Sequence, residues 1–236
     1  MKIDILTIFP RMFVGPFAES LIGRASQKKI LNIDIINIRS FSKDKHKKVD
    51  DKPFGGGVGM VMKLEPLYYA LRSVGGVRRK RNSYKKNSIY RRPYIVYMSP
   101  QGKTLDNEIV KSFTKFRHLI IICGHYEGVD ERVMNYVDEE ISIGDYVLTG
   151  GEIPAMVLTD AIVRMLPGVV KERDSIKNDS FYDGLLDYPH YTRPAVFRGQ
   201  KVPEILLSGN HRKIDEWCAK EAYKRTKERR PDLLKK

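Results

Sequence analysis

The chain has 236 residues, of which 42% are hydrophobic, enough to bury the core of one large domain or two modest ones. This composition excludes a disordered chain and a membrane protein, and two cysteines cannot build a disulfide framework, so we expect a cytoplasmic protein. Lys and Arg outnumber the acidic residues 43 to 29, and the resulting charge of +14 favours a polyanionic partner such as nucleic acid. A basic surface that only confers solubility, or one that attracts anionic lipid, stays open.

The N-terminal part of the chain alternates apolar runs with polar segments. Two stretches rich in Ile and Leu predict strands: 2–9 and 31–38. Three apolar residues between them have helical spacing: Phe17, Leu21 and Ala25. The first run is too short to span a membrane and has no signal-peptide cleavage pattern. Residues 40–60 become basic and then glycine-rich, which is typical of a functional or disordered loop, and 64–74 predicts a helix.

A basic segment follows. Between Arg78 and Arg92 the chain has eight basic residues, two tyrosines and no acidic residue. Such a run is often a solvated loop, and taken alone this interpretation is the better one. It could also follow a phosphate backbone, in which case neutralising it would weaken RNA binding and flatten its salt dependence.

The middle of the chain predicts an α/β domain with a mostly parallel sheet, because short strands alternate with helices. The predicted strands are 94–98, 118–123 and 140–143. The predicted helices are one capped by Thr104 with Leu105, Ile109, Phe113 and Phe116 on its apolar face, a turn or two at 129–136, and 154–166. Residues 167–180 lose periodicity and predict a linker. Beyond it, the spacing of Ile214, Trp217, Cys218 and Ala222 predicts a basic amphipathic helix.

Three segments with small residues follow predicted strands: Ser99–Gly102, Gly124–Arg132 and Ser142–Glu152. Loops that leave the carboxyl ends of parallel strands line the ligand crevice of such a sheet, and glycine lets the backbone approach a ligand. One such loop would be read as an ordinary turn, but three of them favour a binding site. The Gly55–Gly59 segment lacks the Lys-Ser/Thr ending of a phosphate-binding loop.

The cysteines and histidines do not form a recognisable catalytic or metal set. Cys123 lies in an apolar run, so a reactive thiolate is not expected, and this disfavours methylation at a pyrimidine carbon. The five histidines lack the spacing of metal ligands.

Several longer motifs carry a resemblance to a known family. They are VDDKPFGGGVGM (49–60), SPQG (99–102), GHYEGVDERV (124–133), SIGDYVLTGGE (142–152), GLLDYPHYTRP (184–194) and VPEILLSGNH (202–211). In this order, and over nearly the whole chain, they resemble TrmD, the bacterial tRNA (guanine-N1)-methyltransferases. The resemblance implies transfer of a methyl group from S-adenosylmethionine to N1 of the guanine immediately 3′ of the anticodon, guanine 37. Position 125 is His where the family has Arg, and position 58 is Val where Pro is frequent.

The resemblance also implies an architecture. It predicts a SPOUT methyltransferase domain at 1–166, with a trefoil knot over about 94–166, a flexible linker at 167–180 and a helical tRNA-binding domain at 181–236. The knot would not follow from general rules, since chains rarely thread. The enzyme would be a homodimer, with each active site shared between subunits.

Site residues follow from the same resemblance. The expected donor-binding residues are Tyr97, Met98, Ser99, Pro100, Gln101, Gly124, Tyr126, Glu127, Gly128, Arg132, Ile143, Gly144, Tyr146, Val147, Leu148, Gly150, Gly151 and Pro154. Three residues are expected to bind the RNA substrate or support donor binding: Asp50, Gly59 and His190. Mg²⁺ could assist the reaction, with Glu127 as a possible ligand.

Two residues match the family's catalytic positions, Asp179 as general base and Arg164 as its partner. Guanine N1 carries a proton and is a poor nucleophile until that proton leaves, and a carboxylate can take it. Charge then builds on O6, which a guanidinium can stabilise. Without the resemblance, Asp179 would be read as the cap of a helix that starts near Ser180, and Arg164 as a surface ion pair.

Two other functions stay open. A related enzyme could methylate a ribose hydroxyl of another RNA, and loss of Asp179 would then cost little. A non-enzymatic RNA-binding protein would not bind S-adenosylmethionine at all.

Overall fold

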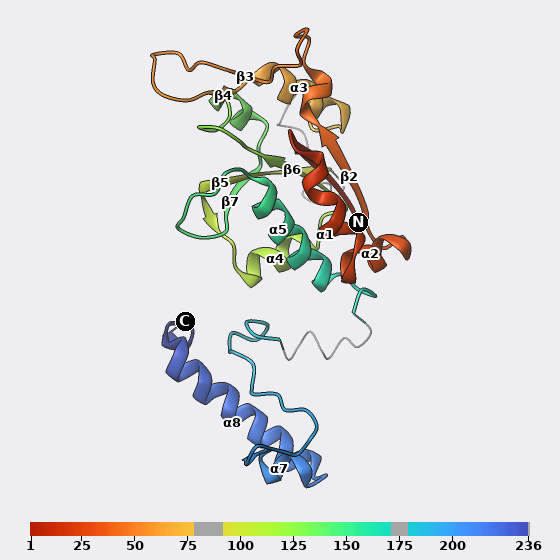
Figure 1. Cartoon of the computed structure of the whole chain (residues 1–236), viewed down its shortest axis with the longest axis vertical. Helices are drawn as coiled ribbons and strands as arrows, with labels where there is room; N and C mark the ends of the chain where they lie inside the picture. Colours follow the sequence, from red (N-terminus) through yellow and green to blue (C-terminus); the bar gives the residue numbers. More distant parts are fainter. Residues whose placement is uncertain (78–91, 171–178, 236) are drawn as a thin grey trace. The chain divides into compact units, whose positions relative to one another are not determined.

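The computed structural model describes residues 1–77, 92–170 and 179–235 (Figure 1). The chain divides into two compact units, Met1–Lys171 and Glu172–Lys236. The division falls inside the segment for which the sequence predicts a linker. The basic run lies outside the described residues except for Arg92, whose guanidinium pairs with Asp138 at 2.8 Å.

The first unit is built on a five-stranded sheet in which all neighbouring strands are parallel, in the order β2-β1-β6-β5-β7. The strands are β1 (Lys2–Thr7), β2 (Asn32–Asn37), β5 (Pro93–Thr104), β6 (His118–Cys123) and β7 (Glu139–Ser142). The predicted α/β fold with a parallel sheet is confirmed. The central strand β6 is apolar along most of its length because helices cover both of its faces.

Each face of the sheet has its own core. One face packs against α2 (Ser20–Gln27), α4 (Asn107–Phe113) and α5 (Glu152–Met165), and the other against α3 (Leu64–Ser73) and the 3₁₀ helix η4 (Glu131–Asn135) (Figure 1). Alternation along β6 divides its side chains between the two cores. Leu119, Ile121 and Cys123 point to the first, and Ile120 and Ile122 to the second.

Several further elements are short. They are the 3₁₀ helices η1 (Pro10–Phe13) and η2 (Ile38–Phe41), the helix α1 (Val14–Ala18) and the strands β3 (Asp50–Asp51) and β4 (Val61–Met62). Phe17, Leu21 and Ala25, which have helical spacing, lie in two helices, the first in α1 and the others in α2. Glu19 is extended and Ser20 has φ 54°, so α1 and α2 are separate. Gly23 makes this turn possible, because a Cβ there would collide with the carbonyl oxygen of Ala18.

The prediction of a loop at Ser99–Gly102 is also wrong, because these residues continue β5. The pairing of β5 with β7 shifts register between Met98 and Lys103, so the strand is irregular there. Gly102 is needed at this point, since a Cβ would collide with the backbone of Glu140. The next helix, α4, is capped by Asp106 and not by the predicted Thr104, since Asp106 Oδ1 accepts from the Ile109 amide at 2.9 Å.

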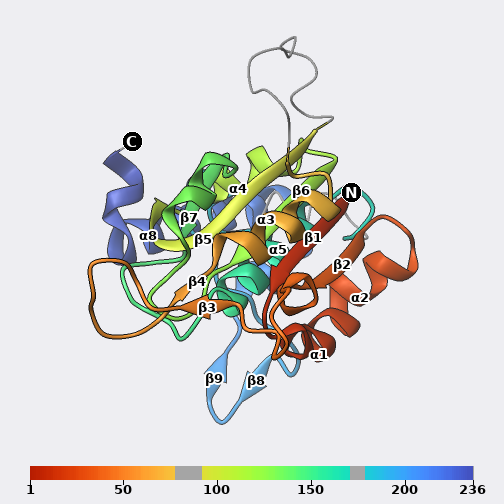
Figure 2. The ribbon, with the colours of Figure 1, turned by 90° about the horizontal axis from the view of Figure 1, so that it is seen from above.

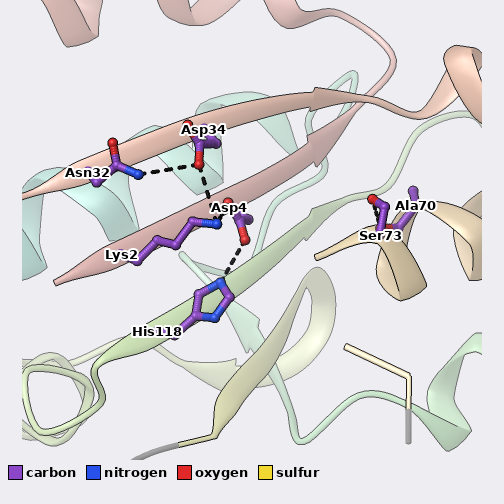
Figure 3. A network of polar contacts seen from close by, with 7 residues as sticks. All are labelled: Lys2, Asp4, Asn32, Asp34, Ala70, Ser73 and His118. Atoms are coloured by element: carbon purple, nitrogen blue, oxygen red, sulfur yellow. Dashed lines mark hydrogen bonds and ion pairs between the residues drawn. The ribbon is translucent and has the colours of Figure 1, made fainter. Parts of the chain in front are cut away.

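A polar network occupies the amino ends of the central strands (Figure 3). Asp4 is fully buried, and its Oδ2 lies 2.6 Å from Nε2 of His118. Lys2 Nζ lies 3.1 Å from Asp4 Oδ1 and 3.4 Å from Asp34. Asp34 also accepts from Asn32 at 3.3 Å. A buried carboxylate is tolerated here because two basic side chains face it.

The second unit contains the predicted amphipathic helix. It is α8 (His211–Arg229), whose N-cap Asn210 accepts from the Lys213 amide at 3.2 Å. Thr226 is its fully buried residue, and the Thr226 hydroxyl accepts from the amide of Leu186 at 2.9 Å. Sequence patterns did not predict the hairpin formed by β8 (Val196–Phe197) and β9 (Gln200–Lys201), seen in Figure 2. The remaining elements are α7 (Glu204–Leu207) and η5 (Pro231–Lys235).

Among the described residues, no helix has the length and apolarity needed to cross a bilayer.

Candidate functional site

A cavity of about 240 Å³ opens at the carboxyl ends of β6 and β7, beside the part of β5 where its pairing with β7 shifts register. In a parallel sheet this edge is where ligands bind, because the loops that leave the strands diverge there. The cavity is lined by Tyr97, Met98, Ser99, Pro100, Gln101, Gly124, His125, Tyr126, Glu127, Gly128, Ile141, Ser142, Ile143, Gly144, Tyr146, Val147, Leu148, Thr149, Gly150, Gly151 and Pro154. The three segments that the sequence singled out therefore meet at one place.

Backbone contact joins two of these segments. The Gly151 amide donates to the Gly124 carbonyl at 2.8 Å, and His125 forms an antiparallel bridge with Gly150. A Cβ on Gly151 would lie 2.8 Å from the Gly124 nitrogen, and one on Gly124 would lie 2.7 Å from the Tyr97 hydroxyl oxygen. Only glycine permits this approach. We call the contact of Gly124 and His125 with Gly150 and Gly151 the glycine joint.

The first half of the Ser142–Glu152 segment is folded by its own polar contacts. The Gly144 amide donates to the Ser142 hydroxyl at 3.2 Å, and the Tyr146 hydroxyl donates to the Ile143 carbonyl at 3.2 Å. Gly144 has φ +146°, a conformation that other residues rarely adopt. Beyond this turn the side chains of Tyr146 and Val147 are exposed. Apolar surface left open beside a cavity is typical of a ligand or partner site.

Two buried side chains near the cavity, Tyr97 and Cys123, have raised pKa values. Burial, with the nearby Glu140 and Glu131 carboxylates, raises the pKa of Tyr97 to about 12, so its phenol stays neutral at ordinary pH. Burial also raises the pKa of the Cys123 thiol well above its usual value, and the thiol is inaccessible. This agrees with the expectation that Cys123 is not a nucleophile.

Of the residues predicted to bind the donor, Arg132 is the one that does not line this cavity. It lies in a second groove with Asp130, and its Nη2 is 2.7 Å from Asp130 Oδ2. The guanidinium beside it lowers the pKa of Asp130. Four lining residues were absent from the prediction: His125, Ile141, Ser142 and Thr149. His125, Ser142 and Thr149 lie within the segments that the sequence singled out for a binding site, whereas Ile141 belongs to the predicted strand 140–143 and carries no signal of a binding role.

The glycine-rich segment contacts the cavity wall. The Glu127 amide donates to the Met60 carbonyl at 3.0 Å, and a Cβ on Gly59, which has φ +94°, would collide with the Glu127 side chain. Asp50 lies nearby in sequence on β3, paired with Met62 of β4. Gly59 and Glu127, predicted separately, are therefore neighbours. Among the described residues, no three His, Cys, Asp or Glu side chains gather in a way that could hold a metal.

The two predicted catalytic residues belong to different units. Arg164 is half-buried in the last turn of α5 in the first unit. Asp179 is half-buried in the second unit, and its carbonyl accepts from the Tyr182 amide at 3.2 Å. No helix begins at or near Ser180, so the interpretation of Asp179 as a helix cap is wrong. His190 is exposed in the same unit, 2.7 Å from Asp187 Oδ2.

Comparison with known proteins gives a consistent result. A family model described as tRNA (Guanine-1)-methyltransferase TrmD matches residues 1–236. A protein of Endomicrobium trichonymphae is 72% identical over 236 residues, with both chains covered completely. Proteins of Fusobacterium nucleatum and Ruminiclostridium cellulolyticum are 55% and 50% identical, covering 99% and 100% of this chain and 91% and 97% of their own. All three are named tRNA (guanine-N(1)-)-methyltransferase.

Proposed function

The chain belongs to the TrmD family of tRNA (guanine-1)-methyltransferases, and from this membership we propose that the cavity at the carboxyl end of its sheet binds S-adenosylmethionine. The chain is a tRNA guanine-N1 methyltransferase, like the relatives with which it shares up to 72% identity over full length. Guanine 37, immediately 3′ of the anticodon, is the proposed target.

The convergence of three separate segments on one cavity supports the donor site best. The glycine joint leaves backbone N–H and C=O groups close to the cavity, and these are the partners that an adenine and a ribose require at fixed places. Leu148, Ile143 and Pro154 provide apolar walls for the adenine. When bound, S-adenosylmethionine supplies an electrophilic methyl group on a sulfonium.

Asp179 and Arg164 are the proposed catalytic residues. The Asp179 carboxylate accepts the N1 proton of guanine, and the lone pair freed on N1 forms the new N–CH₃ bond as the C–S bond breaks. The electron pair of the broken bond stays on sulfur, leaving a neutral thioether. The Arg164 guanidinium stabilises the negative charge that develops on O6.

The proposed enzyme is a cytoplasmic homodimer with a trefoil knot around the donor cavity. Asp179 of one subunit would act beside Arg164 of the other, since the family shares its active site between subunits. Exposed apolar side chains of the first unit are compatible with such an interface, among them Phe54, Val58 and Val147. Mg²⁺, with Glu127 as a ligand, is proposed only as an assistant to the reaction.

The positive charge of the protein supports the proposal of an RNA substrate. The net charge of +14 attracts phosphate, and α8 places many basic side chains on an exposed surface, including Arg212, Lys213, Lys220 and Lys224. Asp50, Gly59 and His190 are the further residues proposed to support substrate and donor binding.

Methyl transfer from labelled S-adenosylmethionine tests this function directly. The substrates are an unmodified tRNA transcript with guanine 3′ of the anticodon and a matched transcript with adenine there. We expect incorporation only into the first, mapped to N1, and a loss of at least about 100-fold in Asp179→Ala with donor binding retained. Equal labelling of both transcripts, or full activity of Asp179→Ala, would contradict the proposal.

A further inference from the structure

A buried carboxylate lies directly behind the glycine joint. Glu152 is the first residue of α5 and follows Gly150 and Gly151, and its side chain is only 2% exposed. Desolvation makes such a group costly unless hydrogen bonds or opposite charges compensate it. Its position at a helix N-terminus contributes part of this compensation.

The Thr7 hydroxyl holds one oxygen of this carboxylate. Thr7 is the last residue of β1 and fully buried, and its Oγ1 donates to Glu152 Oε1 at 2.7 Å. The same hydroxyl accepts from the Phe9 amide at 2.8 Å. The single hydroxyl proton is therefore directed to Glu152, and this hydrogen bond ties the start of α5 to the end of a strand 145 residues away.

The other carboxylate oxygen and His125 Nδ1 lie on the same side of Gly150. A Cβ on Gly150 would lie 2.5 Å from Glu152 Oε2 and 2.6 Å from His125 Nδ1, so both atoms approach the same glycine. Nδ1 is buried and has no hydrogen-bond partner among the described residues. The imidazole is held by ring contacts, with its centroid 4.9 Å from that of Phe9 and 4.9 Å from that of Tyr126.

We propose that Thr7, Glu152 and His125 form a positioning network that sets the shape of the methyl-donor cavity, with Glu152 at its centre. The inference rests on the proposed donor site. Its contacts form a closed circuit, from Glu152 to Thr7, to Phe9, to His125 and back through the glycine joint. Thr7, Phe9 and Glu152 are not among the donor-binding and catalytic residues that the family resemblance implies.

The network is needed because the glycines of the joint have no side chains that could fix their positions. Glycines have no side chains with which to pack, and their backbone loses more conformational freedom on ordering than that of other residues. A charge-assisted hydrogen bond inside the protein is stronger than a neutral one, so the Thr7–Glu152 bond can supply the missing constraint. Without it, a carboxylate oxygen is left buried and unsatisfied, and the start of α5 must shift to find a partner.

Donor affinity measured by calorimetry, with turnover on tRNA at saturating donor, tests the network. Thr7→Val keeps the side-chain shape and removes the hydroxyl, and we expect S-adenosylmethionine to bind about tenfold more weakly while kcat changes little. Thr7→Ser restores the hydroxyl and should recover most of the affinity. Glu152→Gln should weaken binding as well, and the double variant with Thr7→Val should be no worse than the weaker single variant.

Thr159→Val is the matched control. Thr159 is also fully buried, but its hydroxyl donates to the Ala155 carbonyl at 2.7 Å, a hydrogen bond within α5. We expect its donor affinity to equal that of the unchanged protein, even where thermal stability falls.

The outcomes separate this inference from the proposed function. If the unchanged protein does not bind S-adenosylmethionine, the donor site itself is wrong. If it binds and Thr7→Val binds equally well, or no better than Thr159→Val, the positioning network is wrong. A Thr7→Val protein that fails to fold leaves Thr7→Ser and Glu152→Gln to decide, and normal affinity in Glu152→Gln would overturn the proposal.

Discussion

The two ends of the parallel sheet carry polar groups for different purposes. At the amino end, Lys2 Nζ and His118 Nε2 lie 3.1 and 2.6 Å from the Asp4 carboxylate, on β1 and β6 (Figure 3). At the carboxyl end of the sheet, the polar groups surround an open cavity.

The difference teaches how to distinguish a structural polar cluster from a binding site. Both ends have a buried carboxylate, Asp4 at one and Glu152 at the other, so burial of charge does not separate them. What separates them is the backbone. The amino end has ordinary strand geometry, whereas the carboxyl end brings glycines into contact so closely that no side chain would fit.

The largest effect should come from breaking the amino-end network. His118→Phe leaves the fully buried Asp4 without the imidazole 2.6 Å away, and we expect a loss of about 3 kcal/mol in the free energy of unfolding. The double variant Asp4→Leu/His118→Phe should recover most of it, because no unpaired carboxylate remains. Urea denaturation measures both. Donor affinity of the folded protein should be unchanged, and a loss of affinity comparable to that of a cavity variant would erase the distinction between the ends.

A change at the glycine joint should instead weaken donor binding. Gly151→Ala places a methyl group 2.8 Å from the Cys123 Cα and from the Gly124 nitrogen, so the two cavity segments must separate. We expect S-adenosylmethionine to bind about 100-fold more weakly, which corresponds to about 2.7 kcal/mol. Gly199→Ala is a control in the second unit, where a Cβ meets no atom within 4 Å, although φ +80° adds backbone strain. Unimpaired donor binding by Gly151→Ala would refute the role of the joint.

The smallest effect is a pH dependence at the carboxyl end. The pKa of Tyr97 is raised to about 12 by burial, then by Glu140 and Glu131, whereas an unfolded tyrosine titrates near pH 10. Because the folded pKa is the higher one, its stabilisation is complete below pH 10 and is lost as the pH rises toward 12. Tyr97→Phe should therefore lose less stability over this range, by roughly 2 kcal/mol at most. Identical alkaline unfolding curves for the two proteins would show that Tyr97 is not buried in this way.

Much of the fold was predictable because it depends on local patterns. The apolar run 118–123 predicted β6, and the helical spacing within 154–166 predicted α5 nearly to its ends. The errors arose where contacts outside the periodic pattern decide the structure. Ser99–Gly102 looks like a turn, yet it continues β5, whose pairing with β7 resumes at Lys103 after the register shift. The chain turns between α1 and α2, where Gly23 allows the Ala18 carbonyl to come close.

The site shows the same division. By itself, the sequence determined the parallel α/β class, the three segments around the cavity and the family, because these depend on residue order and motif. Asp179 and Arg164 as catalytic residues remain predictions from the resemblance. Only the tertiary structure decided that Gly124 and Gly151 touch, that Arg132 lies outside the cavity, and that Thr7 holds Glu152. Thr7 and Glu152 are 145 residues apart, and no local pattern carries a contact that exists only after β1 and α5 have packed on one sheet.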